Sequence, residues 1–338
     1  MSAAAPFSHP APVDLGRVGL WSGALATLDL AELGEFAAEV EQLGYGTLWS
    51  GEVPGGREAF TQMSVVLAAT TRLVAATGIA NIYLRDASSA AAGASTIAAL
   101  HPGRFVLGLG VSHAPLIEGM LGKDYGKPLA SMRAYLDAMD AVPGRAPEAR
   151  AGRPPVVLAA LGPKMLELAR ERTQGAHPYL VTPEHTRRAR EILGPDRLLA
   201  VEQGVVLTTD REVGLRRARK HLEIYKGLPN YRNNWLRLGF SEEETQGELS
   251  DRLVEALVAC GDEKAIAARV AAQLKDFPGY AQIRRVAALE EPWTVDNGML
   301  TATIIGVLLI PSFFVMIEGK KKKALKTKET ESAPIQHA

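Results

Sequence analysis

Short apolar runs alternate with stretches of helix-spaced apolar residues along most of this chain. Each apolar run predicts a strand, and each stretch between two runs predicts a helix that ends near Gly or Pro. Strands that are apolar throughout and alternate with helices are typical of a parallel sheet covered by helices. The expected strands are residues 18–21, 46–50, 73–79, 104–110, 156–160, 177–181 and 198–207.

Seven strand–helix units in so regular an order favour an α/β fold of the (βα)8 TIM-barrel type. A doubly wound open sheet is the alternative, because periodicity alone does not separate the two. The barrel would span residues 15–274, with a surface linker at 142–155 that is rich in Pro, Gly and Ala. Residues 1–14 predict a disordered lead-in, since they lack the basic start and apolar core of a signal peptide.

The end of the chain departs from this pattern. No clear eighth strand–helix unit follows the expected helix at 263–274, so we expect that unit to be replaced or incomplete, with 280–288 as a surrogate strand in the atypical segment 275–298. Residues 299–317 hold 14 apolar side chains among 19 uncharged residues, close to the roughly 20 that span a bilayer. The basic tail 318–338 carries a run of four lysines at 320–323, as on a cytoplasmic flank. We expect 299–317 to be a transmembrane helix; the alternative is a buried helix or strand that closes the barrel.

Composition narrows the function classes. Lys plus Arg and Asp plus Glu both total 38, and this zero net charge disfavours a nucleic-acid-binding protein. Cys260 is the single cysteine, which excludes a disulfide framework and any multi-cysteine zinc or iron–sulfur site. No pair among the seven histidines has metal-ligand spacing. We therefore expect no metal, no nucleic-acid partner and a cytoplasmic location.

Barrel enzymes place their chemistry at the carboxyl ends of the strands. In this chain those positions are rich in Gly, hydroxyl, amide and aromatic side chains and poor in paired carboxylates. The set suits a flat conjugated cofactor with a phosphate better than glycoside hydrolysis, which usually needs two carboxyl groups. The positions are Trp21–Gly23, Ser50–Glu52, Gly78–Asn81, Gly110–His113, Leu161–Lys164, Tyr179–Thr182 and Glu202–Gln203.

An anion-binding helix start is expected after the fifth strand. Gly162 lets the backbone approach an anion, Pro163 begins a helix at its first position, and Lys164 adds a positive charge. An ordinary helix start with no ligand explains the same three residues.

Histidines and one acid are the candidates for proton transfer. His113 follows the fourth strand, a position where an imidazole is suited to proton exchange near neutral pH. The alternative is an ordinary loop histidine. Glu52 follows the second strand, either as a buried acid or as a helix cap or ion-pair partner. His177 lies inside an expected strand and fits a core histidine, whereas His185 and His221 are expected at the surface.

Five stretches resemble the luciferase-like monooxygenase superfamily, and above all its branch of coenzyme F420-dependent oxidoreductases. They are residues 20–23, 44–52, 76–82, 102–113 and 158–164, and the resemblance covers about 15–273. It implies a barrel, usually a homodimer, that holds a deazaflavin (coenzyme F420) or FMN at the strand ends. The turn 77–80 resembles the bulge behind the deazaflavin ring, which in several relatives contains a non-prolyl cis peptide.

This resemblance also implies roles for single residues. Ser112 and the Gly162–Lys164 turn resemble contacts to the cofactor phosphate. His113 stands where some relatives place a catalytic Glu, and Glu52 is followed by Val53 where alcohol-oxidising relatives carry a His. The expected catalytic residues are His113 and Glu52. The expected cofactor-binding residues are Trp21, Gly78, Ile79, Ala80, Asn81, Ser112, Gly162, Pro163 and Lys164.

The expected function is hydride transfer between coenzyme F420 and a small organic substrate, or FMN-dependent oxygenation. A third alternative is an inactive, membrane-anchored chimera. It arises because 275–286 and 291–301 resemble the end of AMP-forming long-chain acyl-CoA synthetases, and 302–317 resembles the last membrane helix of resistance–nodulation–division efflux pumps.

Overall fold

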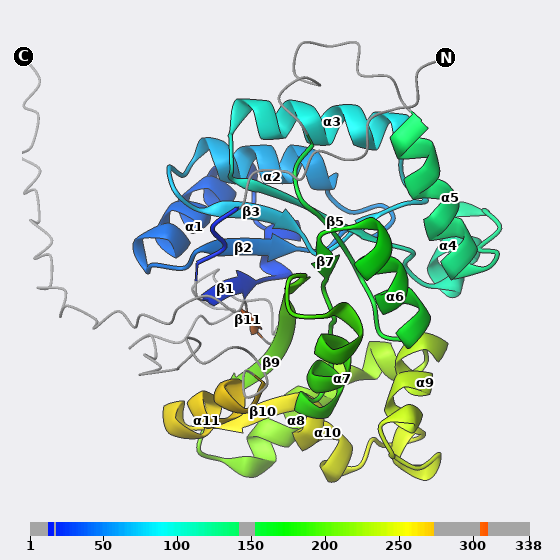
Figure 1. Ribbon diagram of the computed structural model, residues 1–338. Helices are drawn as coiled ribbons and strands as arrows, with labels where there is room; N and C mark the ends of the chain where they lie inside the picture. The colour runs from blue at the N-terminus through cyan, green and yellow to red at the C-terminus, as the bar shows by residue number, and fades with distance from the viewer. Residues whose placement is uncertain (1–12, 17, 142–152, 274–304, 310–338) are drawn as a thin grey trace, which may run out of the picture.

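A parallel sheet forms the centre of the fold. The computed structural model describes residues 13–16, 18–141, 153–273 and 305–309. Seven strands follow one another in sequence order, each parallel to the next (Figure 1). They are β1 (Val18–Trp21), β2 (Thr47–Ser50), β3 (Val74–Thr77), β5 (Phe105–Gly110), β6 (Val156–Leu158), β7 (Gly175–Ala176) and β8 (Leu198–Leu199). The short β4 (Ala80–Asn81) pairs with the end of β5. The predicted parallel α/β sheet is confirmed.

Three further strands complete the sheet. Only Ala200 separates β8 from β9 (Val201–Leu207), and β10 (Val258–Gly261) is parallel to the second half of β9. The strand β11 (Ile305–Leu309) is antiparallel to both of its neighbours, β9 and β1. The ladder therefore runs from β1 to β8, continues through β9 and returns to β1 across β11. An antiparallel strand stands where a (βα)8 barrel has its parallel eighth strand, which confirms that this unit is replaced.

Helices connect successive strands and pack on the outer side of the sheet, as α1, α2 and α3 show in Figure 1. The first begins where Asp29 accepts hydrogen bonds from the backbone N–H groups of Ala31 and Glu32 and Glu32 reaches back to the Asp29 N–H, a capping box. The helices are α1 (Leu30–Gln42), α2 (Ala59–Ala68), α3 (Ala87–Leu100), α4 (Ala114–Leu121), α5 (Pro128–Ala141), α6 (Pro163–Arg172), α7 (Pro183–Leu193), α8 (Arg211–Lys226), α9 (Pro229–Arg237), α10 (Asp251–Leu257) and α11 (Glu263–Gln273), with 3₁₀ turns at Ala24–Ala26 and Glu243–Thr245.

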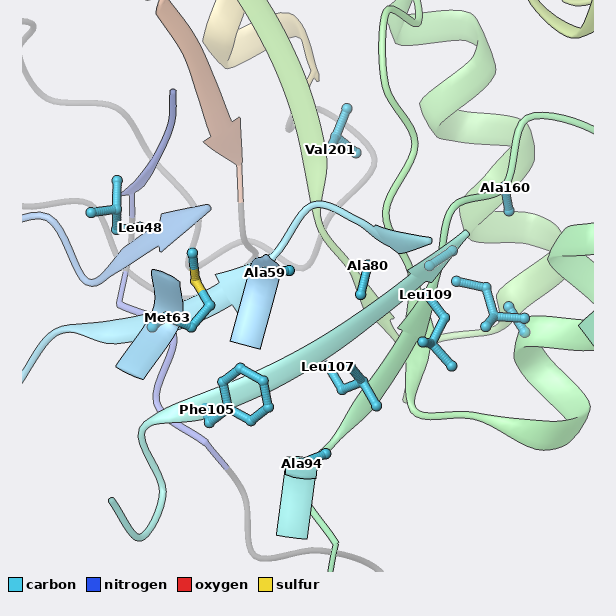
Figure 2. Packing of buried hydrophobic residues seen from close by; sticks show 14 of the residues in the cluster. Leu48, Ala59, Met63, Ala80, Ala94, Phe105, Leu107, Leu109, Ala160 and Val201 are labelled. Carbon is cyan, nitrogen blue, oxygen red and sulfur yellow. The ribbon is translucent and has the colours of Figure 1, made fainter. Parts of the chain in front are cut away.

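Alternate residues of each strand face two different cores. On β5, Phe105, Leu107 and Leu109 pack against the helix layer (Figure 2). Val106, between them, belongs to a separate interior cluster, as expected from the period of two along a strand. The other members of that interior cluster are Leu15, Trp49, Val74, Ala76, Val157 and Ala200. Side chains thus fill the inside of the sheet, as in TIM-type barrels.

The sixth expected strand, residues 177–181, is replaced in the structure by the shorter β7. The paired residues are Gly175 and Ala176 rather than 177–181. A side chain at Gly175 would lie 2.0 Å from the carbonyl oxygen of Leu198, so only glycine allows the two strands to approach here. Two residues beyond the strand, Pro178 cannot donate to a ladder, and Leu180 has a positive φ of 52°.

The expected transmembrane helix is wrong for the residues that the structure describes. Ile305–Leu309, in the middle of 299–317, is a strand whose backbone pairs with β1 and β9. These two sheet edges offer hydrogen-bond partners that a lone apolar segment has only within a helix. No helix in the described part of the chain is long and apolar enough to cross a membrane. The remaining residues of 275–338, including 280–288, lie outside the described residues.

Candidate active site at the carboxyl ends of the strands

A backbone bulge after β3 lies at the centre of the candidate site. The peptide bond between Gly78 and Ile79 is cis, as in the bulge that the resemblance implied. The bulge is fixed on two sides: the Trp21 indole N–H donates to the Gly78 carbonyl at 2.9 Å, and the Glu52 N–H donates to the Ile79 carbonyl at 3.0 Å. Trp21, Gly78 and Ile79, three of the expected cofactor-binding residues, therefore lie together.

Glycines allow the close packing around this bulge. A Cβ atom on Gly78 would lie 2.8 Å from Trp21 Nε1 and 3.1 Å from His177 Nε2. On the neighbouring strand, a Cβ on Gly110 would lie 2.5 Å from the side chain of Ile79. Contacts below 3.0 Å are essentially never found for real Cβ atoms, so a side chain at either position would force a neighbour to shift: the Trp21 indole at Gly78 and the end of the Ile79 side chain at Gly110.

Glu52 holds the turns that follow β2 and β3. Its buried carboxylate accepts hydrogen bonds from the backbone N–H groups of Ala59 at 3.1 Å and Asn81 at 2.9 Å. The guanidinium of Arg85 binds both carboxylate oxygens in a bidentate ion pair. The two carboxylate oxygens of Glu52 thus accept four N–H donors. This arrangement fits the ion-pair and helix-start roles that the sequence left open better than a role as a catalytic acid.

His113 lies at the start of α4, beside Ser112. Its Nδ1 is 3.2 Å from the amide oxygen of Asn230. Because that oxygen only accepts, Nδ1 carries the ring proton and Nε2 keeps its lone pair. Burial lowers the pKa of His113, so the ring is neutral at pH 7. Ser112 has a positive φ of 55°, and its carbonyl accepts a hydrogen bond from the Tyr125 hydroxyl at 3.0 Å.

The amino terminus of α6 follows the neighbouring strand β6. Gly162 is its N-cap and makes no side-chain cap, and Pro163 occupies the first turn, as predicted. The nearest atom to a Cβ built on Gly162 is Nη2 of Arg237, at 3.8 Å. Arg237 comes from the last turn of α9 and was not predicted. The helix start therefore has two cations at or near it, Lys164 and Arg237, a favourable setting for an anion.

His185 is buried, and the expectation of a surface position was wrong. It is 4% exposed, and its Nε2 lies 2.8 Å from the carbonyl oxygen of Leu161, just before the α6 helix start. Burial lowers the pKa of His185 to about 4. The neutral ring therefore donates through Nε2 and connects α7 to the loop between β6 and α6.

An aromatic cluster, which the sequence did not reveal as a unit, covers the same end of the sheet. The ring centroids of Trp21 and Tyr179 are 5.0 Å apart, those of Tyr179 and Tyr225 5.6 Å, and those of Tyr225 and Tyr231 4.9 Å. These are the offset and edge-on separations that aromatic pairs prefer. We define the aromatic cluster as Trp21, His113, Tyr179, His221, Tyr225 and Tyr231.

Two buried titratable groups lie close to this cluster. His177, 2% exposed, is a core histidine as predicted: its ring packs on Trp49 with 4.8 Å between centroids, and its Nδ1 lies 2.8 Å from the Ala200 carbonyl oxygen. Burial lowers the pKa of His177 to about 4. Glu202, 1% exposed, accepts a hydrogen bond from the Leu180 N–H at 3.0 Å, and burial raises its pKa to about 7.

The residues present fit a flat ring that carries hydrogen-bonding groups on its edges. Ser50 Oγ, Asn81 Nδ2 and His177 Nε2 are buried polar atoms at strand ends for which the described residues provide no hydrogen-bond partner. Buried polar groups are normally matched, and a ligand with polar groups on its edge would supply the partners that the described residues do not. Together with the α6 helix start, these atoms define an α/β barrel site suited to a ring-and-phosphate cofactor.

Comparison with known proteins identifies the family. The family profile described as luciferase-like monooxygenase matches residues 12–279, and the chain belongs to that family. It is 28% identical over 256 residues, 62% of this chain and 71% of the relative, to Rv3520c of Mycobacterium tuberculosis, which is assigned as a coenzyme F420-dependent oxidoreductase.

Two solved structures show the same fold. Coenzyme F420-dependent tetrahydromethanopterin reductase from Methanopyrus kandleri has a TM-score of 0.58 at 15% identity, over 80% of this chain and 92% of that chain. The oxygenating constituent of 3,6-diketocamphane monooxygenase from Pseudomonas putida, solved with FMN, has a TM-score of 0.59 at 12% identity, over 80% and 91%. Relatives and structural neighbours thus include coenzyme F420-dependent and FMN-dependent proteins. The expected resemblances of 275–317 to acyl-CoA synthetases and efflux pumps find no support in these comparisons.

Proposed function

We propose that this protein is an oxidoreductase that uses coenzyme F420 for hydride transfer to or from a small organic substrate. The observation that carries the proposal is the joint presence, at one end of the barrel, of the Gly78–Ile79 bulge and the cation-flanked start of α6. A bulge packed by glycines offers a surface for a flat ring, and the helix start offers a site for a phosphate.

Two groups of residues would hold such a cofactor, one at its ring and one at its phosphate. Trp21 and the segment Gly78–Asn81 would lie against the ring, which supplies the hydride chemistry when bound. Ser112 and Gly162–Lys164 would contact the phosphate, and Arg237 is added to them from the structure. Cations that flank a helix start strengthen anion binding, because their charges add to the helix dipole.

His113 is the residue that we assign to proton transfer. Its neutral ring presents Nε2 as an acceptor while Asn230 fixes Nδ1. Replacement of His113 by Ala should therefore lower turnover and leave the affinity for the cofactor nearly unchanged, and an equal loss of both would contradict this role. We assign Glu52 a positioning role, since its carboxylate holds the N–H of Asn81 next to the bulge.

FMN-dependent oxygenation is the second candidate, and the fold shared with an FMN-containing monooxygenase favours it. FMN also combines a flat ring with a phosphate, so the same residues would hold it. The homodimer suggested by the family resemblance stays a prediction.

The deciding experiment titrates the full-length protein with coenzyme F420 and with FMN, followed by cofactor fluorescence. We expect tight binding of coenzyme F420, weakened at least tenfold in Lys164→Ala and in Arg237→Ala, because each loses one cation near the phosphate. Lys264→Ala is the matched control, since Lys264 holds the corresponding second position of α11, and its affinity should equal that of the wild type.

Other results of the cofactor titration would contradict the proposal or part of it. Tight binding of FMN alone would overturn the deazaflavin proposal in favour of oxygenation. Binding of neither cofactor would overturn both and favour an inactive chain. Equal effects of Lys164→Ala and Lys264→Ala would contradict the phosphate site at α6.

A further inference from the structure

The aromatic cluster lies at the edge of a buried hydrophobic core and is partly open. Tyr231 belongs to that core, and Tyr179 and Tyr225 pack against it. Five of its six side chains are partly exposed, and Tyr231 is 7% exposed. The rings come from distant parts of the chain: β1, the loops after β5 and β7, and helices α8 and α9. Trp21 joins this surface to the bulge, because the same indole packs on Tyr179 and donates to the Gly78 carbonyl.

The side chains of the aromatic cluster carry little charge at neutral pH. Burial lowers the pKa of His113, and that of His221 to about 4, so both imidazoles are neutral. Burial raises the pKa of Tyr179 and of Tyr225, so both phenols keep their protons. A charged ligand would lose hydration on this surface without meeting an opposite charge among these side chains, which is costly.

One hydroxyl group on this surface is weakly engaged. Tyr179 Oη lies 3.3 Å from His221 Nε2 and 3.4 Å from the hydroxyl of Tyr225. Hydrogen bonds between two hydroxyl oxygens are usually 2.5–3.0 Å long and those between N and O 2.7–3.2 Å, so both contacts are long. A ligand oxygen at a shorter distance would therefore compete well for the Tyr179 proton.

We propose that the aromatic cluster is the substrate-binding surface and that it takes an uncharged, ring-bearing carbonyl compound whose oxygen accepts a hydrogen bond from Tyr179. The flat faces of the tyrosine rings suit a ring, and the hydroxyl suits an oxygen acceptor. This inference rests on the proposed function, because it places the substrate beside the bulge that would hold the cofactor ring.

The test uses two probes of nearly equal shape, acetophenone and benzoate, which differ in charge. Binding to the full-length protein is measured by tryptophan fluorescence at pH 7.5, with and without coenzyme F420. We expect acetophenone to bind at least tenfold more tightly than benzoate.

We expect Tyr179→Phe to weaken acetophenone binding about fivefold, the effect of one hydrogen bond, with the cofactor affinity changed less than twofold. Tyr45→Phe is the control, since Tyr45 lies between α1 and β2, at the other end of the strands, and it should bind like the wild type.

Outcomes of this test separate the substrate class from the proposed function. Equal or tighter binding of benzoate would overturn the inference even if coenzyme F420 binds. If acetophenone binds more tightly than benzoate but no cofactor binds, the aromatic cluster is supported as a binding surface for uncharged rings, and the proposed function is overturned. If Tyr179→Phe fails to fold by circular dichroism, Tyr225→Phe replaces it. The Tyr225 hydroxyl donates to Tyr179 Oη, so its loss leaves the Tyr179 proton in place and should change acetophenone binding less than twofold. A loss of acetophenone binding in Tyr225→Phe, or no effect in a folded Tyr179→Phe, would contradict the role of the Tyr179 hydroxyl.

Discussion

Glu52 and Arg85 form a buried bidentate ion pair where β2 ends, with side-chain exposures of 3% and 11%. The same carboxylate also accepts the N–H groups of Ala59 and Asn81. One acid thus connects β2, the start of α2 and the strand β4 behind the bulge, and its removal should loosen all three.

Glu52→Gln should lower the free energy of unfolding by about 2 kcal/mol, because Arg85 loses its bidentate partner and keeps only the half-exposed Glu58 carboxylate as a counter-ion. Urea denaturation measures this change. The control is Glu184→Gln in the exposed pair with Arg187, where we expect a change within about 1 kcal/mol. Equal effects of the two substitutions would contradict the structural role of Glu52.

Gly78→Ala should destabilise the protein by about 1–3 kcal/mol, because the new Cβ would press on the Trp21 and His177 rings. Gly119→Ala is the matched control: Gly119 lies in α4 with no atom within 4 Å of its Cβ position. Alanine there should be stabilising by about 0.5–1 kcal/mol through its better helix propensity. Thermal melts of both variants test the pair, and a Gly78→Ala protein as stable as the wild type would refute the tight packing.

His185 should make the fold sensitive to acid. Its pKa is lowered to about 4 in the folded chain, against an ordinary value of 6.5. The unfolded chain therefore binds the proton first, and stability is lost as the pH falls from 6.5 toward 4, by about 2 kcal/mol at pH 5. His177 acts in the same direction. In His185→Gln the difference in unfolding free energy between pH 7 and pH 5 should shrink by about 2 kcal/mol, and an unchanged difference would show that this ring titrates normally.

Glu202 has the opposite dependence. Its pKa is raised to about 7 from an ordinary 4.5, so the folded chain holds the proton more tightly than the unfolded chain does. Its contribution to stability is lost as the pH rises from 4.5 to 7 and stays lost above 7. Glu202→Gln keeps an oxygen acceptor for the Leu180 N–H. It should be no more stable than the wild type at pH 4.5 and about 3 kcal/mol more stable at pH 8. A gain independent of pH would contradict the raised pKa.

Local patterns were enough to predict the order of strands and helices. The apolar runs at Val18–Trp21 and Phe105–Gly110 mark β1 and β5 because residues buried on both faces leave a continuous apolar signal. The capped start of α1 and the Gly–Pro start of α6 depend on neighbours in the sequence, which a pattern records directly.

Features that depend on distant contacts escaped prediction. The partner of Glu52 is 33 residues away, and Tyr179 meets Tyr225 across 46 residues. On α8, His221 and Tyr225 have ordinary helical spacing, and nothing in that pattern indicates which ring they meet. The β11 segment carried an apolar signal that fits a helix or a strand, and the free edges of β1 and β9 decide between the two.

The closing strand β11 has a consequence for synthesis of the chain on the ribosome. β1 is among the first elements to emerge, yet its edge partner ends at Leu309. Until that residue has left the exit tunnel, the nascent polypeptide has two unprotected edges, on β1 and on β9, which can pair with a neighbouring polypeptide on the same messenger. Chaperone capture of translation intermediates should therefore persist until β11 has emerged and paired with β1 and β9.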